Sequence, residues 1–362
     1  MNNVNKYLSY LLVSTVCASA EQLSDSFRLD GYGNVSAYSS SKQNIDAFQL
    51  SGGLQGRYEI TDNMSITGQL HFKEGQNNNQ RPSNSLSDFD SELKWFYLDY
   101  YFDEDVTLRI GAFQFPVFKS SETGDIGYTY TWTQTPLEFY GVFGCDDFEG
   151  IEVLKNFSYE DFDFLAQVSF GQSVNELSNA NAPAIEGKVR DLVGLTLKTT
   201  HDMFSLNVGY LQAHTTLSST DETILSPEVD FYMYALESEI YLNDYTIKSG
   251  FIKTKLSNVF AEDLNYYTSL EYSYNDFTPY ILYSNEILYF QENQNRRDDD
   301  RRRELKDRSI EKYSLGLRYD YNSNIAFKLG YTHEKVSLNF YGENEKEHLS
   351  SNTYMGTMNV VF

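Results

Sequence analysis

Apolar and polar positions alternate along most of this chain, in ribbons of about ten residues separated by polar connectors. In one ribbon, Ile66, Leu70 and Phe72 alternate with polar neighbours, and the same pattern recurs at 190–198 and 312–320. A period of two predicts strands with one apolar face. We place sixteen strands at 27–38, 47–59, 64–74, 92–102, 106–117, 148–157, 162–172, 188–199, 204–215, 229–241, 245–256, 265–274, 278–290, 311–321, 325–336 and 351–362.

The connectors alternate between short and long. The short ones are built of turn residues: Thr61-Asp62-Asn63, Asp103-Glu104-Asp105, Thr200-His201-Asp202, Asn243-Asp244, Asn275-Asp276 and Asn322-Ser323-Asn324. The long ones are polar and include 75–91, 173–187, 291–309 and 338–350. An even number of strands places both termini on one side, where the short turns are expected to face the periplasm.

The last ribbon, 351–362, predicts how the sheet ends. Tyr354, Gly356, Met358 and Phe362 fall on one side of it and form an apolar face. A final strand with a free edge needs a partner, and in an up-and-down arrangement that partner is the first strand. The fold class predicted is all-β: a 16-stranded antiparallel transmembrane β-barrel whose outer face meets lipid.

The composition supports a membrane barrel over a soluble β-sandwich. The chain has 30 Tyr and 25 Phe among 362 residues, and membrane barrels place aromatic girdles at both interfaces. No run of about 20 consecutive apolar residues follows the N-terminus, which excludes a helical membrane protein.

The first twenty residues are typical of a secretory signal peptide. Lys6 precedes a short apolar run, and Ala18-Ser19-Ala20 forms a small-residue cleavage site. The domains expected are a signal peptide at 1–20 and a transmembrane β-barrel domain at 21–362. Because Cys17 would leave with the signal, Cys145 stands alone and no intramolecular disulfide is expected.

The net charge is strongly negative. Removal of the signal leaves 27 basic and 52 acidic residues, a net charge of −25, so nucleic acid is not an expected partner. Membrane lipid and lipopolysaccharide are expected partners. Acidic loops could be bridged to anionic headgroups by divalent cations, or could serve solvation alone.

The connector at 119–147 differs from the other long connectors. Its polar start leads into Tyr130, Trp132, Pro136 and Tyr140, so aromatic and acidic residues are interleaved. A loop with this much apolar area is expected to pack inside the barrel and narrow the bore. The alternative is an outward loop that grips a neighbouring subunit.

The run G-A-F-Q-F-P-V-F-K-S-S-E-T-G-D-I-G-Y-T-Y-T-W-T-Q-T-P-L-E-F-Y is similar to a porin-like group from marine and related proteobacteria. Together with the signal, the sixteen ribbons and the C-terminal Phe, it resembles the Gram-negative general-diffusion porins of the outer membrane. The resemblance implies an inward-folded third loop that faces basic residues on the wall, and a homotrimer. It also implies passive diffusion of small hydrophilic solutes and ions.

We expect the narrowest part of the bore to combine charges of both signs. The acidic candidates on the loop are Glu122, Asp125, Glu138, Asp146 and Asp147; the basic candidates on the wall are Arg28, Arg57, Lys73, Arg109, Arg190, Lys198, Arg318 and Lys328. Opposed charges produce a transverse field that orients dipolar solutes, and the net charge predicts a preference for cations. Each charge could instead form a plain pair with a neighbouring strand.

Other activities find less support in the sequence. The five histidines, at 71, 201, 214, 333 and 348, have no metal-ligand spacing, no cofactor motif occurs, and enzymatic activity is not expected. One rival is a substrate-specific channel, for example for oligosaccharides, with an aromatic slide that includes Tyr32, Tyr97, Tyr101, Trp132 and Tyr267. A non-conducting structural or adhesive barrel is the other.

Overall fold

The computed structural model describes residues 21–41, 45–74, 89–140, 147–177, 185–219, 224–256, 260–290, 305–342 and 346–362. The expected signal peptide, 1–20, lies outside them. The strands are β1 (Glu21–Ser24), β2 (Phe27–Ser40), β3 (Ile45–Thr61), β4 (Met64–Glu74), β5 (Phe89–Tyr101), β6 (Val106–Gln114), β7 (Asp147–Tyr159), β8 (Phe162–Leu177), β9 (Ile185–His201), β10 (Phe204–Ser219), β11 (Ile224–Leu242), β12 (Tyr245–Leu256), β13 (Phe260–Tyr272), β14 (Phe277–Phe290), β15 (Leu305–Asn322), β16 (Ile325–Phe340) and β17 (Glu347–Val361).

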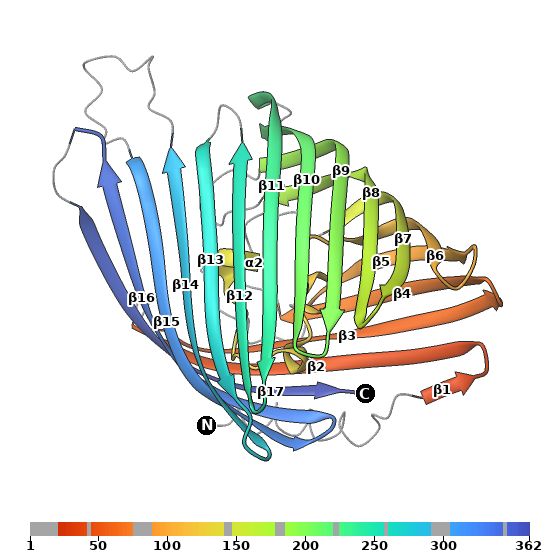
Figure 1. The fold of residues 1–362 in the computed structure, drawn as a ribbon. Helices are drawn as coiled ribbons and strands as arrows, with labels where there is room; N and C mark the ends of the chain where they lie inside the picture. The colour runs from red at the N-terminus through yellow and green to blue at the C-terminus, as the bar shows by residue number, and fades with distance from the viewer. Residues whose placement is uncertain are drawn as a thin grey trace.

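Strands β2 to β17 form a closed antiparallel barrel. Each pairs with the next along the chain, and β17 pairs with β2, so no edge is left over. Figure 1 shows the strands following one another around the wall. This confirms the predicted 16-stranded barrel. The short strand β1, which was not predicted, pairs with the start of β2, where Gln22 lies opposite Arg28.

The two faces of the strands differ as the alternation predicts. On β4, Ser65, Thr67 and Gln69 are buried on the inner face, whereas Leu70 is 46% exposed on the outer face. On β16, Lys328 is buried, whereas the neighbouring Leu329 is 68% exposed. The outer face therefore presents an apolar surface of the kind that a bilayer covers.

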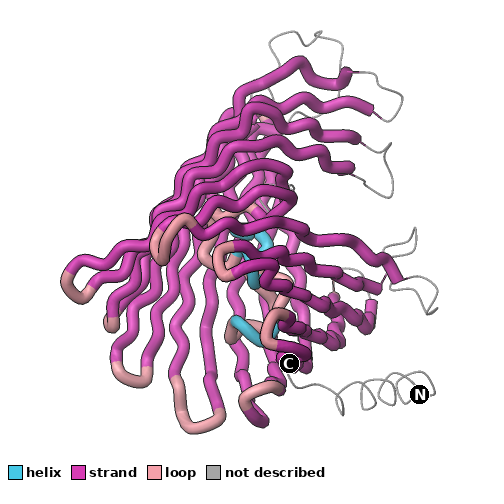
Figure 2. Tube along the Cα trace, turned by 90° about the vertical axis from the view of Figure 1, so that its right-hand side faces the viewer, coloured by secondary structure: helices cyan, strands magenta, loops and turns pink. Residues whose placement is uncertain are grey.

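The short connectors are tight turns that gather at one end of the barrel (Figure 2). Asn243 and Asn275 have φ values of 53° and 51°, in the left-handed region that Asn tolerates better than most residues. At the turn between β5 and β6, the Asp103 carboxylate accepts hydrogen bonds from the backbone N–H groups of Asp105 and Val106. These bonds lower the pKa of Asp103.

The seam is closed by the last residue. The backbone N–H groups of Gly31 and Phe362 each donate to the other's carbonyl, at 2.8 and 2.9 Å. The Phe362 ring lies over Gly31 so closely that a Cβ at position 31 would approach it to 2.2 Å. A side chain at this position would therefore displace the ring.

Helical structure in the described part is limited to three short turns between β6 and β7. They are η1 (Ser121–Thr123), η2 (Gly127–Thr129) and α2 (Leu137–Tyr140), which lie within the outline of the barrel in Figures 1 and 2. No described helix is both long and apolar enough to cross a bilayer.

Candidate functional site

The candidate site is built around residues 115–140, which we call the inner segment. It leaves β6 and contacts strands on several sides of the barrel through their inner-facing side chains. It is thus held by long-range contacts rather than by regular structure of its own. Three sets of contacts fix it, and a fourth brings charged groups together.

The first set lies on β15 and β16. The Lys328 ammonium group donates to the carbonyls of Gly127, Tyr130 and Trp132, at 2.5, 2.6 and 2.8 Å, and lies 4.2 Å from the centre of the Tyr130 ring. Arg318 donates to the carbonyl of Tyr130 at 3.0 Å. Two basic residues predicted to line the pore therefore hold the backbone of the inner segment, and Lys328 is only 1% exposed.

The second set lies at the seam between β2 and β17. Asn34 donates to the carbonyl of Asp125 at 2.8 Å and accepts from the N–H of Gly127 at 3.1 Å. Asn359 in turn donates to the Asn34 side-chain oxygen at 2.9 Å. Gly127 fits closely here, since a Cβ would lie 2.2 Å from the Asn359 amide nitrogen.

The third set, on β10 to β13, is largely apolar. Phe118, Trp132 and Phe139 of the inner segment belong to one buried apolar cluster with Leu211 and Met233 of the wall. Phe139 and Tyr267 meet edge to face with ring centres 4.8 Å apart, a favourable geometry. We call this part of the interior the packed side.

One buried carboxylate organises the polar contacts of the packed side. Glu237 accepts hydrogen bonds from the hydroxyls of Tyr140 and Tyr267, at 2.7 and 3.2 Å, and from the N–H of Lys119 at 2.5 Å. Burial first, and then the nearby Glu237 carboxylate, raises the pKa of Tyr140 well above its usual range. Tyr140 is therefore a neutral donor at ordinary pH.

The fourth set, on β5 and β6, brings charges of opposite sign together. Arg109 forms a two-pronged pair with Asp99, at 2.9 and 3.3 Å, and its guanidinium lies 4.0 Å from the centre of the Tyr97 ring. It also reaches Glu122 of the inner segment at 3.4 Å. Lys94 reaches Asp125 at 3.3 Å. We call the inner face of β3 to β6 the polar side.

The loop carboxylates of the polar side remain open to solvent. The side chains of Glu122 and Asp125 are 55% and 40% exposed, whereas those of Arg109 and Lys94 are 12% and 10% exposed. A cavity of about 410 Å³ lies between Ile126 and Tyr128 of the inner segment and the wall strands β2 to β4. The amides of Gln55 and Gln69 also line this cavity.

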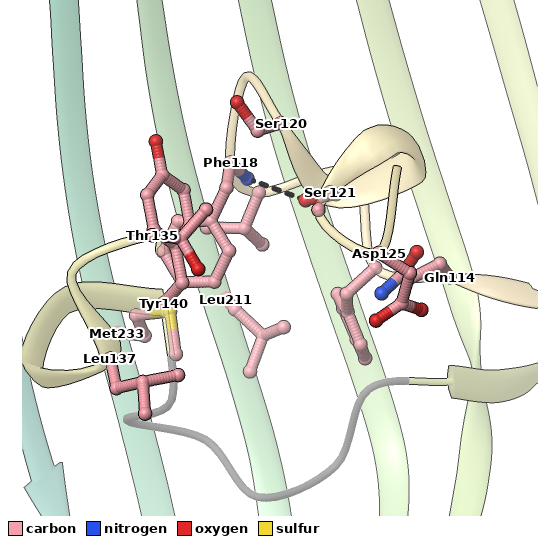
Figure 3. A pocket seen from close by; sticks show the side chains of 13 residues that line it. Gln114, Phe118, Ser120, Ser121, Asp125, Thr135, Leu137, Tyr140, Leu211 and Met233 are labelled. Carbon is pink, nitrogen blue, oxygen red and sulfur yellow. Dashed lines mark hydrogen bonds between the residues drawn. The ribbon is translucent and has the colours of Figure 1, made fainter. Parts of the chain in front are cut away.

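A second cavity, of about 190 Å³, is enclosed largely by the inner segment itself, against Leu211 of β10 and Met233 of β11 (Figure 3). Phe118, Leu211 and Met233 form an apolar wall, while Asp125 and Gln114 lie at the other side. The inner segment therefore divides the interior without filling all of it.

Four other predicted basic residues lie on the inner face but away from the loop carboxylates. Arg57 donates to the Tyr101 hydroxyl at 3.0 Å, and Arg28, whose side chain is 68% exposed, pairs with Asp30. Lys198 lies opposite Asn207, a buried inner-facing residue. Lys73 lies opposite Ser51 near the end of β4 and is exposed.

Arg190 does not face the interior, contrary to the prediction. Asp191, with φ of 50°, lies at a bulge between β9 and β10, where Gln212 pairs with Val193 but His214 pairs with Arg190. The extra residue shifts the alternation by one position. Val189 consequently faces inward and is buried, and Arg190 is exposed on the outer side.

The remaining acidic candidates cannot be placed in the site. Asp146 lies outside the described residues, and the side chains of Glu138 and Asp147 lie outside the described part of the structure.

Sequence reasoning missed Lys94 and Glu237. A bulge in β5 leaves Lys94 as an extra residue between Leu93 and Trp95, which pair with Leu70 and Gln69. Simple alternation gives no sign of this. Glu237 is visible in the sequence as an acidic residue at an inward position of a predicted strand, which is a usable signal for a buried polar contact.

The aromatic residues considered for a sugar slide are mostly covered. Tyr32, Trp132 and Tyr267 are 6%, 3% and 5% exposed, and Arg109 lies over the Tyr97 ring. Rings that are covered in this way offer little face on which a sugar could stack.

No protein-family model and no curated protein sequence matches this chain. Solved structures do match it. OmpT, an outer membrane protein of Vibrio cholerae, has a TM-score of 0.59 at 14% identity, covering 95% of this chain and all of that one. Salmonella typhi OmpF in complex with daunomycin has a TM-score of 0.57 at 14% identity, with 93% and 98% covered.

The outer membrane channel DcaP of Acinetobacter baumannii is also similar, with a TM-score of 0.58 at 9% identity over 95% of this chain and all of that one. At these identities the similarity concerns the fold alone. The chain thus has the fold of outer-membrane β-barrels.

Proposed function

We propose that this protein is an outer-membrane channel of a Gram-negative cell, through which small hydrophilic solutes and ions diffuse passively. The observation that carries the proposal is the polar side. There, exposed Glu122 and Asp125 lie beside Arg109 and Lys94 in a closed barrel, next to a cavity lined by amide side chains. Polar groups that line a hydrated passage favour water and ions over apolar solutes.

In this proposal the inner segment narrows the path by occupying the packed side. The anchors at Lys328, Asn34 and Glu237 hold it, so solutes pass through the gap on the polar side, beside the exposed carboxylates of Glu122 and Asp125. The partly exposed carboxylates draw cations toward this gap, whereas the basic partners are largely covered. A preference for cations follows.

The test is reconstitution of the folded protein into a planar bilayer. Discrete conductance steps and a reversal potential of cation-selective sign under a potassium chloride gradient are expected. Equal permeability of potassium and chloride would remove the cation preference. A folded barrel that inserts but gives no steps would contradict the channel itself.

The second candidate is a non-conducting structural barrel, which the apolar packing on β10 to β13 favours. A lumen sealed on the polar side as well would give no conductance under any salt. The oligosaccharide-specific channel is supported less, because three of the proposed slide rings are buried. Block of the conductance by an oligosaccharide would reverse that order.

We further propose a homotrimer. An apolar groove of about 900 Å³ lies on β15 to β17, β2 and β3, with Leu317, Leu329 and Tyr354 beside Gly330 and Gly356. One similar structure, OmpT of Vibrio cholerae, is described in a trimer form. Chemical crosslinking in detergent would show a limiting band at three chains, and a monomer at all protein concentrations would contradict this assembly.

A further inference from the structure

Three neighbouring strands bring a histidine and two carboxylates together on the outer side of the barrel. His214 lies on β10 between the inward-facing, buried residues Ala213 and Thr215. Asp191 lies at the bulge of β9, and Glu228 lies on β11. One ligand atom from each of Asp191, His214 and Glu228 lies within 4.8 Å of the other two.

The surroundings of the His214 ring differ from those of the other histidines. Its Nδ1 is enclosed and makes no hydrogen bond with any described residue, although Asp191 Oδ2 lies 3.4 Å away. Each of the other four has a hydrogen bond at Nδ1: His71, His201, His333 and His348. A nitrogen with lone-pair character, aimed among carboxylates and otherwise unused, is available to coordinate a cation.

The other ring nitrogen has a partner of the kind that supports metal binding. His214 Nε2 lies 3.3 Å from Asp230 Oδ1, and the two residues are directly opposite in the β10–β11 pairing. Histidines that bind metal commonly direct the second ring nitrogen at a carboxylate, which fixes the tautomer and makes the ligand nitrogen more basic. Asp230 is in place for this role.

The carboxylates of the cluster are open to aqueous ions. Along the outer side of β10, the order is Val208, Tyr210, Gln212 and His214, running from the apolar belt through an aromatic residue to polar residues. The side chains of Asp191 and Asp230 are 78% and 49% exposed. The cluster therefore lies beyond the apolar belt, toward the end with the long connectors.

We propose that Asp191, His214 and Glu228 bind a divalent first-row transition-metal ion such as Zn²⁺, with Asp230 orienting the histidine. One imidazole nitrogen and two carboxylates are donors that Zn²⁺ accepts, and water completes a four-coordinate site. The ion also offsets the negative charge of the carboxylates gathered around one ring. Positions 191, 214 and 228 form no recognisable motif, because only the barrel register makes them neighbours.

The test is a calorimetric titration of the purified, folded full-length protein in detergent with zinc chloride. The buffer contains excess Mg²⁺, which occupies weak carboxylate sites. One saturable Zn²⁺ site per chain is expected. His214→Gln is expected to abolish the saturable binding, and Asp230→Asn to weaken it about tenfold. His348→Gln removes a histidine that already hydrogen-bonds Ser337 and is the matched control, expected to bind as the unchanged protein does.

Folding of every variant is checked by the heat-dependent mobility of the barrel in SDS gels, which does not depend on the metal. Absence of saturable binding in the folded protein would overturn the proposal. If His214→Gln still binds Zn²⁺ at one saturable site, the binding comes from a diffuse acidic surface and the proposal is overturned. The same conclusion follows if Ca²⁺ competes with Zn²⁺ for the site at equal concentration. None of these outcomes depends on channel activity.

Discussion

The packed side and the polar side of the interior are made of the same alternating strands and are filled in opposite ways. On β10 and β11 the inward positions include Leu211, Met233 and Ala235, which are covered by aromatic residues of the inner segment. On β3 to β6 the inward positions include Gln55, Arg57 and Arg109. Gln55 and Arg57 hydrogen-bond other side chains of the wall, and Arg109 meets the exposed Glu122 of the same segment. Stability is therefore expected to reside on one side and ion choice on the other.

Removal of the largest ring of the packed side should have the largest effect on stability. Trp132→Ala leaves a cavity and removes the indole N–H that donates to the Ser269 hydroxyl at 2.9 Å in the unchanged protein. A loss of about 3–5 kcal/mol in the free energy of unfolding is expected for a buried Trp. Urea unfolding of the barrel in detergent measures this loss. Phe102→Ala, at an exposed position, is the control, and a smaller loss for Trp132→Ala than for Phe102→Ala would contradict the assignment of stability to the packed side.

Removal of the Lys328 ammonium group should come next. Lys328→Met keeps the chain length but leaves the carbonyls of Gly127, Tyr130 and Trp132 without this donor. A loss of about 1–3 kcal/mol is expected for unsatisfied buried groups, together with a noisier and larger conductance as the inner segment loosens. Lys346→Met, at an exposed position, is the control. An unchanged current trace would mean that the other anchors suffice.

Tyr140→Phe should have a smaller effect that depends on pH. It removes the hydrogen bond to Glu237 and is expected to cost about 1 kcal/mol near neutral pH. Because the folded pKa of Tyr140 is raised, its stabilising contribution is full below the unfolded pKa of about 10 and is lost as pH rises above that value.

The difference in unfolding free energy between the unchanged protein and Tyr140→Phe should therefore shrink in alkaline solution. The same comparison with Tyr58→Phe, a half-exposed outer residue, should show no such trend. A difference that is constant from neutral to alkaline pH would show that Tyr140 does not resist ionisation.

The smallest effect on stability, and the largest on ion choice, is expected on the polar side. Glu122→Gln combined with Asp125→Asn removes two exposed partners of Arg109 and Lys94, which should cost less than about 1 kcal/mol. The reversal potential should shift toward anions in the proposed channel. Glu104→Gln with Asp105→Asn, in a turn, is a control with the same charge change, and an equal shift there would assign selectivity to overall charge.

The sequence predicted the sixteen strands because alternation and turn chemistry are local properties. It failed at Arg190 and Lys94, where bulges in β9 and β5 shift the alternation by one residue. Arg109 and Glu122 were both predicted to line the narrowest part of the bore, and they lie 3.4 Å apart. The path of the inner segment was beyond prediction in detail, because Lys328 and Asn34 reach it from strands that are distant in the sequence.

The hydrogen bond from the Lys328 ammonium group to the Gly127 carbonyl joins positions 201 residues apart. The inner segment can reach its final position only after β16 has formed and paired in register. The wall of the barrel is therefore expected to form before the inner segment docks. During biogenesis the barrel is therefore expected to pass through a state in which the inner segment has not yet docked and its aromatic side chains are still uncovered.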